Sequence, residues 1–251
     1  MFVDANTKIC CIGDSLTDTV WASAVGTELY KYRVDPSKHW TNVLTAKSGI
    51  TLINKGIGGQ TTSQMLARFT TDVVKQNPKY CTIWGGVNDV FQHNTTSTAA
   101  NFKSMIDLCK NNGIVPILVA CPTNYYNEPY KDQEIAGLKT LYDTVKQVSR
   151  ENDIPLIELY KSNMLIAGNL NLDCYITIDK VHFTEVSHAT VAAFMETSLD
   201  ILTSPVRAAN IKRLRMSLIS ELTRRNQTQA SYTDPTLDTL LVKGLHIQEI
   251  S

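Results

Sequence analysis

The chain has 251 residues, of which 43% are hydrophobic, so it can bury a sizeable core as one α/β domain with an appendage or as two small domains. Its 24 basic and 24 acidic side chains cancel, and bulk charge therefore gives no reason to expect nucleic acid or an anionic membrane as a partner. No apolar run approaches the roughly 18 residues that span a bilayer. Residues 1–8 lack the basic lead and apolar core of a secretory signal, which favours a cytoplasmic protein.

Apolar runs and helix-period stripes alternate along the first 160 residues. The runs predict five strands, at residues 8–12, 51–54, 80–84, 114–120 and 155–159. Amphipathic spacing and capping residues predict helices at 21–29, 39–47, about 61–74, 99–110 and 133–150, and a last one at 185–202. A polar loop is expected after the third strand, and residues 160–178 are expected to be an irregular connection. Strands that alternate with helices form βαβ units, so we expect a parallel sheet with helices on both faces.

Pro205 marks a boundary near the end of the chain. The pattern of residues 206–225 predicts an amphipathic helix with a basic face. This face could contact a phosphate-rich surface, or it could simply be solvated or face another copy of the chain. A polar stretch and an apolar tail follow. We expect residues 205–251 to be an extension that packs on the main domain or mediates homo-oligomerisation.

Six cysteines are present. Most fall in predicted strands or in a helix, which favours buried free thiols in a reducing compartment. Their spacing fits no zinc site, and no metal is expected. A disulfide that involves Cys174, in a later loop, stays open.

Ser15, Gly59 and Asn88 each follow a predicted strand, so all three should lie on the rim where ligands bind in parallel α/β sheets. Acyl transfer at a serine needs a nucleophile, a base, an acid that orients the base, and donors for an oxyanion. Ser15 can be the nucleophile, His182 the base, and Asp179, three residues earlier, the orienting acid. The backbone amides of Ser15 and Gly59 and the side-chain amide of Asn88 can be the donors; glycine at 59 would let backbone approach the reacting centre closely.

Each of these residues also has a purely structural interpretation. Ser15 could be a helix N-cap, His182 a cap or core histidine, and Asn88 and Asp89 turn formers. His188 is a competing base, but it falls inside a predicted helix and has no acid three residues upstream. The tyrosines of the loop after the fourth strand could line a pocket or merely anchor that loop: Tyr125, Tyr126 and Tyr130.

Four short blocks occur in a fixed order along the chain. They are Gly13-Asp14-Ser15-Leu16, Asn54-Lys55-Gly56-Ile57-Gly58-Gly59, Gly86-Val87-Asn88-Asp89 and Asp179-Lys180-Val181-His182. Each block is weak alone, but the ordered set is specific. In these blocks the chain resembles the SGNH (GDSL) hydrolase superfamily of esterases and lipases, over roughly residues 8–203.

The resemblance implies a three-layer α/β/α sandwich of flavodoxin-like type with a five-stranded parallel sheet, formed by residues 1–204, plus the extension at 205–251. It implies a triad of Ser15, His182 and Asp179, and an oxyanion hole formed by Ser15, Gly59 and Asn88. The doubled glycine leaves open whether the amide of Gly58 or of Gly59 faces the oxyanion. No metal or organic cofactor is implied.

The expected activity is hydrolysis of a carboxylic ester through an acyl-enzyme on Ser15. Relatives of this type include carbohydrate acetylesterases, lysophospholipases and thioesterases, and the absence of a long apolar lid segment favours a short acyl group, with an O-acetyl carbohydrate as first choice. A lipid or thioester substrate is the enzymatic alternative. A binding or structural module that keeps the fold without turnover is the alternative from another class.

Overall fold

The computed structural model of this chain describes residues 7–19, 34–120, 132–159, 165–166, 169–170 and 182–203. Several expectations therefore lie outside the described residues, namely the helix at 21–29, the tyrosine loop, Cys174, Asp179 and the extension at 205–251. Most of the described residues belong to one compact unit that ends at Ser198. No helix in the described part of the chain has the length and apolarity that a membrane crossing requires.

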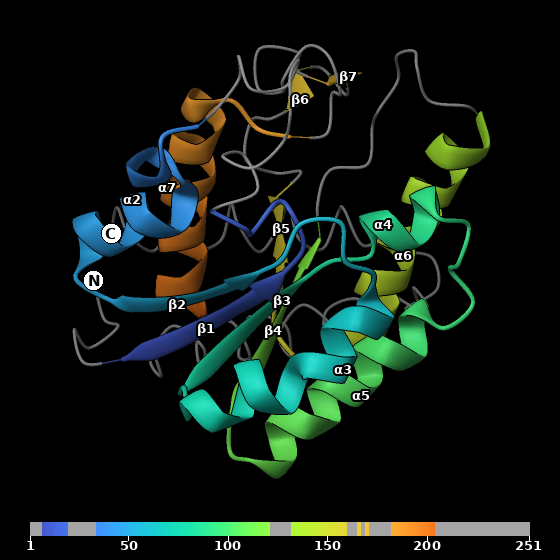
Figure 1. Cartoon of the computed structure of the whole chain (residues 1–251), viewed down its shortest axis with the longest axis horizontal. Helices are drawn as coiled ribbons and strands as arrows, with labels where there is room; N and C mark the ends of the chain where they lie inside the picture. Colours follow the sequence, from blue (N-terminus) through green and yellow to red (C-terminus); the bar gives the residue numbers. More distant parts are fainter. Residues whose placement is uncertain are drawn as a thin grey trace, which may run out of the picture. The chain divides into compact units, whose positions relative to one another are not determined.

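The centre of this unit is a five-stranded sheet with strand order β2-β1-β3-β4-β5, and every strand pair in it is parallel. Figure 1 shows the strands side by side with helices on both faces. The strands are β1 (Lys8–Gly13), β2 (Thr51–Gly56), β3 (Tyr80–Trp84), β4 (Val115–Ala120) and β5 (Leu156–Glu158). The predicted α/β fold with a five-stranded parallel sheet is confirmed.

The strand order reverses between β1 and β3, because the chain first adds β2 on one side of β1 and then builds β3 to β5 on the other. At such a switch point the loops after the two strands separate and leave room for a ligand. Ser15 follows β1 and Asn88 follows β3. The topology thus places both residues beside the switch point.

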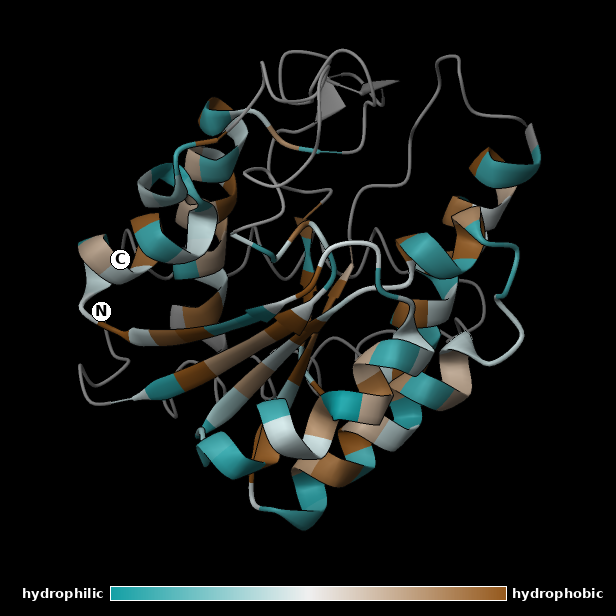
Figure 2. Ribbon diagram, in the orientation of Figure 1, coloured by the Kyte–Doolittle hydropathy of each residue, from teal (hydrophilic) through white to brown (hydrophobic). Residues whose placement is uncertain are grey.

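Burial follows the position of each strand in the sheet. All five residues of β3 are buried, as are five of the six in β1 and in β4, whereas no residue of the edge strand β2 is fully buried. This explains why β1, β3 and β4 are continuous apolar runs without alternation. Figure 2 shows the hydrophobic residues concentrated along these strands and on the helix faces turned toward them.

Helices cover both faces of the sheet (Figure 1). One face carries α2 (Trp40–Ser48) and α7 (Glu185–Thr203), which an ion pair between Lys47 and Glu196 joins at 2.6 Å. The other carries α3 (Thr62–Asp72), α5 (Thr98–Asn111) and α6 (Asp132–Glu151). Two 3₁₀ turns, η2 (Pro36–Lys38) and η3 (Val74–Gln76), flank α2 and α3. The predicted helices in the described ranges are confirmed to within about two residues.

Three details differ from the expectations. A short helix, α4 (Val87–Phe91), replaces the start of the polar loop after β3. Strand β2 continues two residues beyond Asn54, to Gly56, which pairs with Gly13. A small antiparallel pair, β6 (Leu165–Ile166) and β7 (Asn169–Leu170), lies within the connection expected to be irregular.

Candidate active site

Ser15 lies on a tight turn directly after β1. The carbonyl oxygen of Asp14 accepts hydrogen bonds from the amides of Thr17 at 3.1 Å and Asp18 at 3.0 Å, and its carboxylate Oδ1 accepts from the Leu16 amide at 3.0 Å. Asp14 therefore bonds local backbone. The turn fixes the backbone on both sides of Ser15, whose side chain stays partly exposed.

The second block packs against this turn. A Cβ added at Gly56 would meet the backbone nitrogen of Asp18 at 2.2 Å, so only glycine allows β2 to run this close to the turn. Asn54 donates from Nδ2 to the Thr17 carbonyl and accepts the Gly56 amide at 2.9 Å. The glycine that resembles a strand breaker in the sequence is thus a packing requirement.

His182 reaches the turn from the chain just before α7. Its Nε2 lies 2.8 Å from the Ser15 hydroxyl oxygen, a hydrogen bond that joins residues 167 positions apart. With the ring proton on Nδ1, Nε2 accepts the serine hydroxyl proton, which is the arrangement of a nucleophile and its base. The described residues directly after Ser15, 16–19, form a turn and no helix, so Ser15 caps no helix within that range. Asp179 lies outside the described residues, so its role stays a prediction.

The glycine pair forms a turn from Ile57 to Gln60, closed by a bond from the Gln60 amide to the Ile57 carbonyl at 3.4 Å. Gly59 has a φ of +77° at its third position, where turns of this type require glycine. A Cβ there would meet nothing within 4 Å. The backbone conformation therefore gives a reason for glycine at this position, and a close approach of the backbone to the reacting centre stays a prediction.

The turn also distinguishes the two glycine amides. The Gly58 amide donates to the Asp18 carboxylate at 2.9 Å. Within the described ranges, the Gly59 amide has no hydrogen-bond acceptor. Gly59 is thus the better candidate of the two to donate to an oxyanion.

Asn88 is the second residue of α4, which begins after Gly86, a residue with φ of +103°. Its Nδ2 donates to the carbonyl oxygen of Gln60 at 3.0 Å, directly after Gly59. An amide carries two N–H groups, and this bond uses one of them. The structure therefore brings the second and third blocks together through Asn88 and Gln60.

Asp89 is buried and ties three elements together. Its carboxylate accepts from the Thr62 amide at 2.8 Å, from the Thr62 hydroxyl and from the Thr98 hydroxyl at 3.0 Å. These partners begin α3 and α5. The interpretation of Asp89 as a turn former missed this role, since its partners lie up to 27 residues away.

A cluster of aromatic rings and buried histidines includes Phe183, the residue after His182. Trp84 packs on Trp40 and on Phe183, and His188 packs on Phe183 and His39. His188 Nδ1 accepts the Trp40 amide at 3.4 Å, and burial lowers the pKa of His188 to about 4, with His182 nearby adding to this. Within a helix, His188 could be either solvated or packed, and the structure shows it packed in α7. No three His, Cys, Asp or Glu in the described ranges gather as a metal would require.

The fold is shared with solved structures of known type. A protein from Desulfitobacterium hafniense assigned to the G-D-S-L lipolytic family superimposes with a TM-score of 0.62 over 77% of this chain and 100% of that one, at 22% identity. Axe2, an acetylxylan esterase from Geobacillus stearothermophilus, superimposes with a TM-score of 0.62 over 78% of this chain and 96% of that one, at 21% identity. The protein has the SGNH-type hydrolase fold.

Residues 11–190 match the model of the GDSL-like lipase/acylhydrolase family, and the chain belongs to this family. Among curated proteins, it is 30% identical over 158 residues to the uncharacterized lipoprotein YqeF of Bacillus subtilis, and 33% identical over 100 residues to an acetylxylan esterase of Geobacillus stearothermophilus. The matches cover 53% and 37% of this chain, and 65% and 44% of those relatives. The chain thus spans less than two thirds of the length of either relative.

Proposed function

We propose that this protein is a serine esterase that hydrolyses a short-acyl carboxylic ester, with an O-acetylated carbohydrate as the favoured substrate class. The contact of 2.8 Å between Ser15 Oγ and His182 Nε2 carries the proposal. It joins the first and last blocks at the edge of the sheet where α/β proteins bind ligands. Similarity to an acetylxylan esterase supports the acetyl and carbohydrate parts of the proposal.

In the proposed mechanism, His182 Nε2 takes the proton of Ser15 as the serine oxygen attacks the ester carbonyl. The amides of Ser15 and Gly59 and the side chain of Asn88 donate to the oxyanion. Protonated His182 then gives its proton to the leaving alcohol, which leaves an acyl group on Ser15. A water that gives its proton to His182 attacks this acyl group, and the acid leaves as the serine oxygen regains the proton. Asp179 would orient His182 from the same loop.

The test compares wild type with Ser15→Ala on p-nitrophenyl acetate, butyrate and octanoate, and on an acetylated xylo-oligosaccharide. Loss of the nucleophile should reduce the rate by about 10⁴ to 10⁶, as in other serine hydrolases. Acetyl turnover well above octanoyl turnover supports a short acyl group, and the reverse order favours a lipid-type substrate. Equal turnover by both proteins would refute catalysis by Ser15, and an inert wild type would leave the binding-module alternative.

A covalent test is independent of substrate choice. A fluorophosphonate should label wild type at Ser15, identified by mass spectrometry of the tryptic peptide. His182→Gln should slow labelling strongly, since the base that removes the serine proton is then missing. Labelling at equal rates in both proteins would contradict the role of His182.

A further inference from the structure

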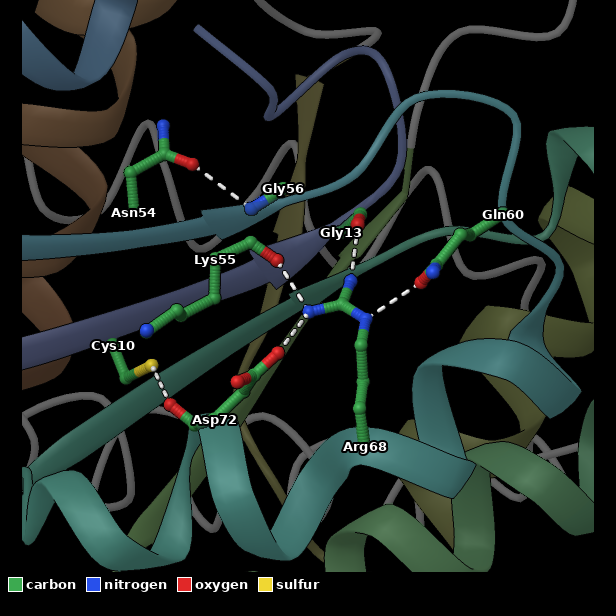
Figure 3. A network of polar contacts seen from close by, with 8 residues as sticks. All are labelled: Cys10, Gly13, Asn54, Lys55, Gly56, Gln60, Arg68 and Asp72. Atoms are coloured by element: carbon green, nitrogen blue, oxygen red, sulfur yellow. Dashed lines mark hydrogen bonds and ion pairs between the residues drawn. The ribbon is translucent and has the colours of Figure 1, made fainter. Parts of the chain in front are cut away.

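The guanidinium of Arg68 lies at the centre of a polar network beside the candidate site. Figure 3 shows the side chain rising from α3 toward the ends of β1 and β2. Its Nε donates to the Gln60 Oε1 at 2.6 Å, its Nη2 to the Gly13 carbonyl at 2.9 Å, and its Nη1 to the Lys55 carbonyl and an Asp72 carboxylate oxygen, both at 2.8 Å. Only 14% of the side chain is exposed.

The two carbonyl groups that accept from Arg68 belong to the strands that lead into the candidate site. Gly13 is two residues before Ser15, and its carbonyl also accepts the amide of Ile57, the first residue of the glycine turn, at 3.1 Å. Lys55 lies near the end of β2. One planar cation therefore joins the strand that leads to Ser15 with the strand that leads to Gly59.

The contact with Gln60 extends this network to the third block. The Gln60 side chain accepts from Arg68, while its backbone carbonyl accepts from Asn88 at 3.0 Å. Gln60 thus lies between Arg68 and the side-chain amide of Asn88, and follows Gly59 directly. Two of the three candidate oxyanion donors depend on the conformation of one residue that Arg68 binds.

An ordinary structural role accounts for only part of this geometry. Arg68 and Asp72 are four residues apart on α3, and such a pair stabilises a helix only weakly. The other three bonds leave the helix and end on the two strand ends and the glycine turn. Lysine could supply the charge but not the fork, because an ammonium cannot direct donors in one plane to several fixed acceptors.

We propose that Arg68 is a positioning residue that holds Gly59 and, through Gln60, Asn88 in the geometry of an oxyanion hole. The inference rests on the proposed function, since it names what aligns the donors for that reaction. Displacement of donors by about 1 Å can cost on the order of 100-fold in rate without direct contact with substrate. Arg68 therefore acts on the transition state more than on substrate binding.

The experiment compares wild type, Arg68→Lys and Gln60→Met in the hydrolysis of p-nitrophenyl acetate. Arg68→Lys should lower kcat by about 10- to 100-fold and change KM by less than about 3-fold, because donors aligned for the oxyanion act mainly in the transition state. Gln60→Met removes the acceptor of Nε but keeps the backbone carbonyl that binds Asn88, so its loss of kcat should be smaller, about 3- to 10-fold. Affinity for phenylboronic acid, which forms a tetrahedral adduct with serine, should fall in parallel with kcat/KM.

Lys103→Met is the matched control. Lys103 and Asp107 form the same type of pair, four residues apart at 2.8 Å, on the exposed face of α5. This variant should keep the kcat and boronic acid affinity of wild type. Thermal unfolding of all variants separates a misplaced site from an unfolded protein.

The outcomes separate the two proposals. If wild type turns over the ester and the kcat of Arg68→Lys lies within 2-fold of the wild-type value, the positioning role alone is overturned. A loss of kcat with unchanged affinity for the boronic acid overturns it as well. If Arg68→Lys does not fold, Gln60→Met decides by the same two criteria. A wild type that neither turns over esters nor binds the boronic acid overturns the proposed function and the positioning role with it.

Discussion

The indole N–H of Trp40 donates to the carbonyl oxygen of Leu16 at 3.0 Å. Trp40 is the first residue of α2, and Leu16 follows Ser15. Both side chains are buried, with 1% and 2% of their surface exposed. The first residue of one helix thus fixes the turn that presents the candidate nucleophile.

Replacement of Trp40 by Phe should weaken both the fold and the site. The change leaves the Leu16 carbonyl without its donor, at a cost of about 1 to 3 kcal/mol in addition to the lost packing. Because that carbonyl belongs to the Ser15 turn, kcat should fall as well. Urea unfolding and ester hydrolysis measure the two effects.

Trp84→Phe is the matched control. Trp84 is also buried and packs on Trp40, but its indole nitrogen has no hydrogen-bond partner in the described part of the chain. The same substitution there removes ring volume and no hydrogen bond. An equal loss of stability in the two variants would contradict the importance of the bond to Leu16.

Gly59→Ala should separate backbone strain from catalysis. Alanine at a φ of +77° costs roughly 1 to 2 kcal/mol. Gly49→Ala, at the C-terminus of α2 with φ of +71°, carries the same strain away from the site, and at neither position would a Cβ meet an atom within 4 Å. The two variants should lose similar stability, but only Gly59→Ala should lose kcat. Equal kcat values would argue against Gly59 as a donor.

Asp14 should make the fold more stable in mild acid. Burial raises its pKa to about 7, against the lowering effect of the Leu16 amide, and nearby Asp89 raises it further. The folded-state pKa exceeds that of the unfolded chain, about 3.9. The stabilisation is therefore complete below about pH 4 and is lost as the pH rises through about 7, by up to about 1.4 kcal/mol per pH unit.

Asp14→Asn removes this titration. Urea unfolding at pH 5 and pH 8 should show that Asp14→Asn loses more stability relative to wild type at pH 5 than at pH 8. A difference that does not change with pH would contradict a raised pKa for Asp14.

His39 should make the fold less stable in mild acid, which is the opposite of the effect of Asp14. Burial, and then the neighbouring His188, lower the pKa of His39 to about 2. Its folded-state pKa lies below that of the unfolded chain, about 6.5. The stabilisation is therefore complete above about pH 6.5 and declines as the pH falls below it toward the folded-state value.

His39→Asn tests this effect without loss of the helix cap, because the Nδ1 of His39 accepts the Thr41 amide as N-cap of α2 and asparagine caps well. The variant should be less stable than wild type at pH 7.5, with a gap that narrows toward pH 5. A gap of constant size would show that His39 binds protons equally in both states.

Apolar runs and hydrophobic periodicity predicted most of the fold. Strand β3 was predicted with its observed bounds, because a strand buried on both faces is a short apolar run. Helix α4 has only five residues and no apolar period to detect. The end of β2 was missed because Gly56 looks like a strand breaker, whereas its reason is the close approach of Asp18.

The blocks predicted Ser15 and His182, which a hydrogen bond joins, while the role of Asp179 stays a prediction; the residues that support the site were missed. Arg68 occupies a mostly buried position on an otherwise ordinary amphipathic helix, and two of its acceptors are backbone carbonyls 13 and 55 residues away. A backbone carbonyl has no sequence signature. Contacts of this kind become visible only in the folded chain.

Buried cysteines in the central strands also make it possible to follow the opening of the sheet over time. Cys10, Cys11, Cys81 and Cys109 are buried free thiols, as predicted, and burial raises the pKa of Cys11 to about 12 and that of Cys81 well above its usual value. A thiol reacts with alkylating agents as the thiolate and only where reagent can reach it. Iodoacetamide should therefore modify Cys11 and Cys81 only when β1 and β3 separate from their covering helices, and the alkylation of these two peptides would time the opening of the sheet.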